Sequence, residues 1–243
     1  MKVIVAENYE HQCSLAADIF EEIVRAKPDC CLGLATGSSP VGMYKELGRR
    51  CKENGLDFSK VHSVNLDEYV GLTPDHDQSY RYFMDTNFFD LINIDKSNTY
   101  VAKCTGDIDA NIKEFNEILD KCDVDIQLLG VGPDGHLGFN EPGDALIDPA
   151  HKEVLDESTI DANARFFKTR DEVPRYAVTM GMGNIMRAKR LLLIISGNKA
   201  NAASQLLMND EITPKCPATF MKLHRDATVI IEKKLADEIG YKY

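Results

Sequence analysis

Short apolar runs alternate with amphipathic stretches along the whole chain. The apolar run at residues 2–6 precedes a stretch in which Leu15, Ile19 and Ile23 recur every four positions. This spacing places side chains on one face of a helix, so the pattern predicts a strand followed by a helix over residues 9–26. The same alternation predicts further strands at 30–35, 61–66, 125–130, 191–196 and 228–232, and helices at 41–51, 78–89, 109–122, 199–208 and the C-terminus.

This order of elements predicts one α/β domain covering residues 1–243. Strands that alternate with helices are typical of βαβ units and of a mostly parallel sheet flanked by helices. Residues 142–174 have weak periodicity and mixed charge, so we expect a lid or binding loop there. Ligands of such folds bind at the carboxyl ends of the strands, so the strand-to-helix turns are the places to search for a site.

Composition narrows the class of protein. The chain has 28 Lys and Arg against 39 Asp and Glu, a formal charge of −11. This acid excess argues against nucleic-acid binding, and the longest apolar run, residues 191–195, is far shorter than a membrane span. The first apolar run is too short for a signal peptide. We therefore expect a cytoplasmic protein that binds neither nucleic acid nor membrane, and whose seven cysteines are reduced thiols.

The first informative turn is Thr36-Gly37-Ser38-Ser39-Pro40, between a predicted strand and a predicted helix. Ser39 is a favourable N-cap, and Pro40 fits the first helical position. Free N–H groups, hydroxyls and the helix dipole would together form a cradle for a phosphate or a carboxylate. The alternative interpretation is an ordinary capped helix start.

The second turn follows the strand predicted at 61–66 and carries two adjacent carboxylates, Asp67 and Glu68. In most loops such a pair is simply solvated. At the carboxyl end of a buried strand, however, a partly desolvated carboxylate can act as a general base.

The third turn, residues 130–143, is rich in glycine. Gly130, Gly132 and Gly135 satisfy the G-x-G-x-x-G pattern after a strand, so a dinucleotide-dependent oxidoreductase must be considered. Two more glycines and a proline follow where that pattern requires a regular helix, which disfavours this interpretation.

The same turn carries Asp134, His136 and Glu141. An imidazole flanked by carboxylates is held in one tautomer, and its charged form is favoured, as a proton shuttle requires. A lone histidine in a turn is more often a structural residue, but three such groups together favour a functional site. One histidine at irregular spacing from two carboxylates is a weak metal signature, so we expect no metal.

Together and in this order, the three turns resemble the glucosamine-6-phosphate deaminase family. The most specific similarity lies in Leu66-Asp67-Glu68-Tyr69 and in the block from Asp134-Gly135-His136 to Phe139-Asn140-Glu141-Pro142. Further similarity covers nearly the whole chain, at residues 36–40, 79–80, 87–89, 163–167, 177–181 and 196–200.

The resemblance implies a modified Rossmann-like fold and an enzyme that converts D-glucosamine 6-phosphate and water to D-fructose 6-phosphate and ammonia, with no nucleotide cofactor and no metal. It implies that Asp67 moves a proton between C2 and C1 of the open-chain sugar. It further implies that His136, oriented by Asp134 and Glu141, assists ring opening. The implied phosphate site consists of Thr36, Gly37, Ser38, Ser39, Arg165 and Lys199.

The chain departs from the longer, allosteric members of that family at residues 143–154. Where those members carry a serine pair and an Arg/Lys cluster for the activator N-acetylglucosamine 6-phosphate, this chain has acidic residues and Pro149. It also ends at Tyr243, without their C-terminal extension. We therefore expect a short form that this activator does not stimulate.

Several alternatives remain open. A related enzyme could act on galactosamine 6-phosphate, because the sequence does not locate the contacts that read the orientation of one hydroxyl. A 6-phosphogluconolactonase is less favoured, because hydrolysis of a lactone needs no base for a carbon-bound proton. A non-catalytic sugar-phosphate sensor would usually carry a DNA-binding module. Members of the family form hexamers or monomers, so both assemblies remain open.

Overall fold

A seven-stranded parallel sheet forms the centre of the molecule. The computed structural model describes residues 1–243, apart from the side chains of Ser158 and Ala162. The strand order is β1-β10-β9-β6-β2-β3-β5, and every neighbouring pair is parallel. The strands are β1 (Lys2–Ala6), β2 (Cys31–Leu34), β3 (His62–Asn65), β5 (Thr99–Tyr100), β6 (Val124–Leu129), β9 (Leu191–Ile195) and β10 (Ala227–Glu232). The predicted α/β fold with a mostly parallel sheet is confirmed.

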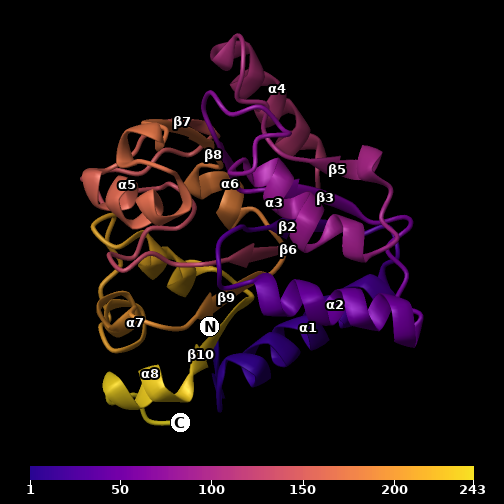
Figure 1. Cartoon of the computed structure of the whole chain (residues 1–243). Helices are drawn as coiled ribbons and strands as arrows, with labels where there is room; N and C mark the ends of the chain where they lie inside the picture. Colours follow the sequence, from indigo (N-terminus) through magenta and orange to yellow (C-terminus); the bar gives the residue numbers. More distant parts are fainter.

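The helices flank this sheet. Figure 1 shows α1 and α2 packed together on one side, with α4 on the opposite side. α1 begins after Asn8, whose side chain accepts the N–H of His11 at 2.9 Å, as an N-cap does. The helices are α1 (Tyr9–Ala26), α2 (Val41–Asn54), α3 (Tyr80–Asn87), α4 (Ile108–Lys121), α5 (Glu157–Asn163), α6 (Met182–Met186), α7 (Ala200–Leu207) and α8 (Lys233–Glu238). None of these helices is both long and apolar enough to cross a membrane.

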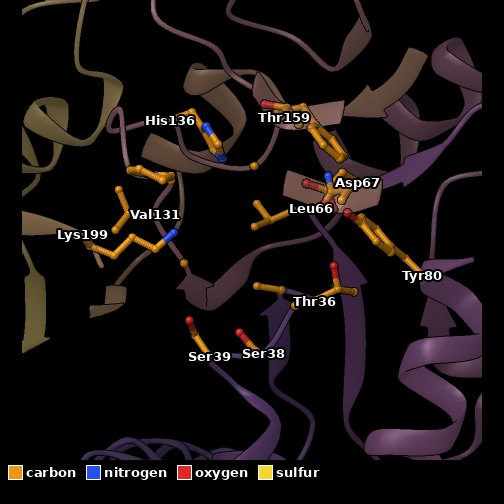
Figure 2. Close-up of a pocket in the computed structure, with 18 of the residues that line it drawn as sticks. Thr36, Ser38, Ser39, Leu66, Asp67, Tyr80, Val131, His136, Thr159 and Lys199 are labelled. Carbon is orange, nitrogen blue, oxygen red and sulfur yellow. The ribbon is translucent and has the colours of Figure 1, made fainter. Parts of the chain in front are cut away.

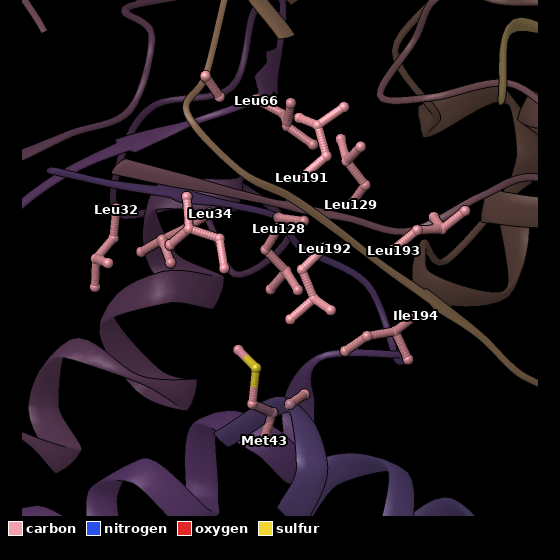
Figure 3. Close-up of a cluster of buried hydrophobic side chains, with 14 of the residues drawn as sticks. Leu32, Leu34, Met43, Leu66, Leu128, Leu129, Leu191, Leu192, Leu193 and Ile194 are labelled. Atoms are coloured by element: carbon pink, nitrogen blue, oxygen red, sulfur yellow. The ribbon is translucent and has the colours of Figure 1, made fainter. Parts of the chain in front are cut away.

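The core consists of apolar side chains on both faces of the sheet. Every residue of β9 is buried, which explains its continuous apolar sequence. Figure 3 shows Leu191 and Leu193 on one face of this strand, while Leu192 and Ile194 point to the other, toward Met43 of α2. Successive side chains of a strand point to opposite faces, so a run such as Leu-Leu-Leu-Ile-Ile needs cover on both.

A second, antiparallel sheet was not predicted. It contains β4 (Asp67–Tyr69), β8 (Tyr176–Thr179) and β7 (His151–Val154) in the order β4-β8-β7. The interpretation of Asp67 and Glu68 as turn residues is therefore wrong. Strands of three or four residues carry too little periodicity to be recognised, and these strands form only because segments far apart in sequence pair with one another.

The segment expected as a lid, residues 142–174, is more regular than its sequence indicated. It holds β7, α5 and two short 3-10 turns, Ala164–Phe166 and Arg170–Glu172. Arg170 forms ion pairs with Glu157 and Asp161, which join the second of these turns to α5.

Two cysteines are paired. Cys31, at the start of β2, forms a disulfide with Cys122, which follows α4, across a sequence separation of 91 residues. The expectation that all seven cysteines are reduced thiols is wrong for this pair. The other five are free: Cys13, Cys30, Cys51, Cys104 and Cys216.

Candidate active site

A cavity of about 350 Å³ opens at the carboxyl ends of the parallel strands. Its walls come from the turns that follow β2, β3, β6 and β9, together with the segment around α5 (Figure 2). The expected site residues that line it are Thr36, Gly37, Ser38, Ser39, Asp67, Asp134, His136, Arg165 and Lys199. The remaining one, Glu141, lies behind His136 and contacts its ring. The three turns identified in the sequence therefore meet in one cavity.

The turn after β2 forms the floor of the cavity (Figure 2). The Tyr9 hydroxyl supports this turn from α1: it lies 3.1 Å from the carbonyl oxygen of Ser38 and accepts the N–H of Gly42 at 3.0 Å. The expectation that Ser39 caps α2 is wrong, because the helix begins after Pro40 and its end has no side-chain cap. The hydroxyl of Tyr9 takes over part of that role, which leaves the serine side chains directed into the cavity.

Two cationic side chains line the same cavity. Lys199 immediately precedes α7. Burial lowers its pKa, the charge of Asp134 opposes this effect, and the charge of Arg165 adds to it. The guanidinium of Arg165 lies 4.7 Å from the ring centre of Phe166, in the 3-10 turn after α5. A desolvated ammonium beside a guanidinium is stabilised by an anion between them, so this end of the cavity favours a phosphate or a carboxylate.

Asp67 lies in the opposite wall, with only 6% of its surface exposed. Burial raises its pKa to about 8, and the charge of Glu68 adds to this effect while that of His136 opposes it. A Cβ at Gly138 would lie 3.2 Å from the Asp67 carboxylate and 3.0 Å from the Thr179 hydroxyl, and the residue has φ +60°. Glycine therefore lets the third turn pass directly against Asp67. A carboxylate with so high a pKa is a stronger base than an ordinary aspartate.

His136 is held between two carboxylates. Its Nδ1 lies 2.8 Å from Asp134 and 3.4 Å from Glu141. Burial alone would lower the pKa of His136, but these contacts outweigh burial and raise it to about 9. Burial would likewise raise the pKa of Asp134, yet contact with His136 holds it at about 2. The ring is therefore an imidazolium at neutral pH, and Nε2 remains available to a ligand.

The same three residues form a potential metal site. One ligand atom from each of Asp134, His136 and Glu141 lies within 4.8 Å of the others. The His136–Asp134 contact at 2.8 Å equally fits a proton-transferring pair, and the one imidazole in the group is already engaged by carboxylates.

One glycine of the third turn makes room for the histidine. A Cβ at Gly132 would overlap the imidazole of His136. Close packing within the turn therefore explains Gly132, and the positive φ of Gly135, +97°, explains the third glycine. No regular helix follows the pattern.

Several residues of the site were missed. Tyr80 lines the cavity beside Asp67, and Thr159 of α5 donates its hydroxyl hydrogen to Glu141 at 2.8 Å. Glu68 was identified only as a neighbour of Asp67, yet it accepts hydrogen bonds from the first turn of α3. The helix predicted at 78–89 and the family similarity at residues 79–80 pointed to this helix end, where Ser79 is the N-cap of α3, but neither assigned Tyr80 to the site.

Comparisons with known proteins agree on one family. Residues 6–230 match the family described as glucosamine-6-phosphate isomerases/6-phosphogluconolactonase. A glucosamine-6-phosphate deaminase of Clostridium perfringens (strain 13 / Type A) is 50% identical over 241 residues, which cover 97% of this chain and 98% of the relative. A solved structure described as a monomeric glucosamine-6-phosphate deaminase superimposes with a TM-score of 0.95 at 41% identity, covering 98% of this chain and 99% of the other. A 6-phosphogluconolactonase from Trypanosoma brucei shares the fold, with a TM-score of 0.77, 15% identity and 98% coverage of both chains.

The first prediction concerns the charge of His136. Replacing Asp134 with Asn removes the closest carboxylate, so burial is less strongly opposed and the pKa of His136 should fall from about 9 by about one unit or more. An NMR titration of the imidazole nitrogens measures this change. His151 is an internal control: burial lowers its pKa, and contact with Glu153 outweighs burial and raises it. Its midpoint should be the same in the variant as in the wild type. A midpoint of His136 that stays at the wild-type value would refute the assignment.

Proposed function

The chain belongs to the family of glucosamine-6-phosphate isomerases and 6-phosphogluconolactonases, and we propose that it acts as a glucosamine-6-phosphate deaminase. It converts D-glucosamine 6-phosphate and water to D-fructose 6-phosphate and ammonia. The observation that carries the proposal is the buried carboxylate of Asp67, with its raised pKa. It lies in the same cavity as Arg165 and Lys199, the two cations suited to a phosphate. A base of this kind is needed to remove a proton from carbon.

Binding of the phosphate is the first step. The N–H groups and hydroxyls at Thr36–Ser39 would receive the phosphate oxygens, with Lys199 and Arg165 as counter-charges. The formal charge of −11 means that long-range attraction cannot guide the substrate, so these local groups must supply the binding energy. A phosphate held far from the reacting carbons orients them toward Asp67.

Ring opening is the second step. The imidazolium of His136 gives a proton to the ring oxygen through Nε2, because Nδ1 faces Asp134 and Glu141. These two carboxylates stabilise the imidazolium before transfer and keep the ring in one orientation. The C1 hydroxyl gives its proton to solvent as the aldehyde forms, and the neutral imidazole regains a proton from solvent, so atoms and charges balance.

Isomerisation and deamination follow. Asp67 takes the proton from C2 while the C1 oxygen gains one from solvent, which forms an enolamine. Asp67 then returns its proton to C1, and the nitrogen releases one to solvent, which leaves an imine at C2. Water adds to the imine, and loss of ammonia gives the ketone of fructose 6-phosphate. Hydrolysis of a lactone, the other reaction named for this family, moves no proton to or from carbon. It therefore leaves Asp67 without a role as a carbon-proton base.

We also propose that the enzyme acts as a monomer in the cytoplasm. The matched deaminase structure is described as monomeric, which supports the first part. A phosphorylated sugar does not cross a bilayer unaided, because moving its charge into hydrocarbon is very costly, which supports the second. The disulfide between Cys31 and Cys122 is uncommon for that compartment.

The reaction itself can be tested with purified protein. We expect ammonia and fructose 6-phosphate to appear in equal amounts from glucosamine 6-phosphate, without added metal. Galactosamine 6-phosphate and 6-phosphogluconolactone, assayed in parallel, test the two related activities. Faster turnover of either of these compounds would overturn the proposed substrate.

Asp67→Asn tests the carbon-proton base. The amide keeps the size of the side chain but cannot accept the C2 proton, so kcat should fall by about 10²–10⁴-fold. Binding of the substrate should survive, because the phosphate contacts lie at the other end of the cavity. Calorimetric titration with glucosamine 6-phosphate measures binding, and a variant with the wild-type kcat would remove Asp67 from the mechanism.

The absence of allosteric activation can be tested by adding N-acetylglucosamine 6-phosphate. Residues 143–154 of this chain lack the serine pair and basic cluster of the activated relatives. We expect the substrate saturation curve to keep its midpoint, or to move to higher substrate concentration if the two compounds compete. A shift to lower substrate concentration would contradict the expectation.

A further inference from the structure

Glu68 is a buried carboxylate that the proposed mechanism does not use. It follows Asp67 in β4, and only 3% of its surface is exposed. Its two oxygens accept three backbone N–H groups, from Tyr69 at 2.9 Å, from Tyr80 at 2.9 Å and from Arg81 at 3.0 Å. Two of these donors belong to the first turn of α3, where a negative charge is favoured by the helix dipole.

These contacts favour the ionised form of Glu68. Burial raises its pKa to about 7, and the three N–H groups oppose this rise. Both oxygens face donors, so a protonated carboxyl would point its own hydrogen at an N–H group and lose a bond. Glu68 therefore carries a second negative charge, at the position after Asp67 in β4, as the pH rises above 7.

Glu68 also fixes the position of Tyr80. The backbone N–H of Tyr80 is bonded to Glu68, while its ring lies parallel to that of Phe139, with centres 6.2 Å apart and an interplanar angle of 2°. The ring of Tyr69 packs against it at 4.8 Å. In Figure 2 the Tyr80 side chain lies beside Asp67 in the same wall of the cavity. Burial keeps the pKa of the Tyr80 hydroxyl well above its usual value, so the group remains a hydrogen-bond donor.

We propose that Glu68 is a positioning residue for the deamination: its carboxylate anchors Tyr80 beside Asp67 and places a second negative charge at the next position of β4. The catalytic part of this inference rests on the proposed function. The contacts that define it, however, can be tested without any substrate.

The ionisable groups near Asp67 and Glu68 must be considered in any titration of Asp67. His136 faces Asp67 and lowers the pKa of its carboxyl, whereas Tyr69 and Tyr80 stay neutral over the relevant pH range because burial raises the pKa of both. Burial also raises the pKa of Cys104, whose thiol lies against the Glu68 carbonyl oxygen. The guanidinium of Arg81 turns away to Asp85 and Thr99.

Glu68→Gln separates charge from shape. Glutamine keeps the length of the side chain and one acceptor oxygen, but it carries no charge. The pKa of Asp67 should then fall by about one unit from its wild-type value. Titration of the Asp67 carboxyl carbon by NMR, with ¹³C-labelled aspartate, measures this without relying on activity. Asp107→Asn is the matched control, because Asp107 caps α4 by accepting the N–H of Ala110 at 3.1 Å; its removal should leave Asp67 unchanged.

Glu68→Asp tests anchoring and also serves if the glutamine variant does not fold. Aspartate keeps the charge but is too short to hold the first turn of α3 in place. The midpoint of Asp67 should then stay within about 0.3 unit of wild type, while kcat for glucosamine 6-phosphate falls about 10-fold or more.

A wild-type kcat in this variant would overturn the anchoring role. A midpoint of Asp67 unchanged in folded Glu68→Gln, or lowered as far in Glu68→Asp, would overturn the electrostatic role. Failure of wild-type enzyme to release ammonia would refute the proposed function and leave the NMR result standing.

Discussion

Removal of the Asp67 carboxyl from water is the constraint on which the site depends. Burial is the largest influence on this group, and it turns an ordinary acid into a base with a pKa of about 8. The fold maintains that burial from two sides: β4 pairs with β8 behind Asp67, and Gly138 brings the third turn against it. The small antiparallel sheet therefore has a chemical purpose, since without it the carboxylate would be a solvated loop residue with an ordinary pKa.

The cavity separates two kinds of electrostatics. At one end, N–H groups and two cations make a place for an anion in a protein that is acidic overall. At the other end, carboxylates dominate, and each is paired with groups that decide its protonation state. Contact with His136 holds the pKa of Asp134 low, and three N–H groups oppose the rise that burial causes in the pKa of Glu68. For Asp67, burial is the largest influence, and it raises the pKa. Different environments thus give these three acidic side chains different pKa values.

The sequence predicted what depends on local patterns. The central strands β6 and β9 are buried and rich in aliphatic residues, so both could be located to within a residue or two. Three strand-to-helix turns gave the main site residues because parallel strands end at one edge of the sheet. What could not be predicted depends on contacts between distant segments. The pairing of β4 with β8, the disulfide between Cys31 and Cys122, and the contact of Thr159 with Glu141 leave no trace in the local pattern.

The most direct test of this account is the fate of the proton at carbon. A single buried carboxylate can reach only one face of the enolamine, so in D₂O the deuterium that exchanges onto Asp67 should enter only one of the two C1 positions of fructose 6-phosphate. NMR of the product distinguishes these positions. Deuterium in a single C1 position agrees with proton delivery by Asp67. Equal labelling of both positions would mean that water protonates an exposed intermediate, and it would contradict the central claim.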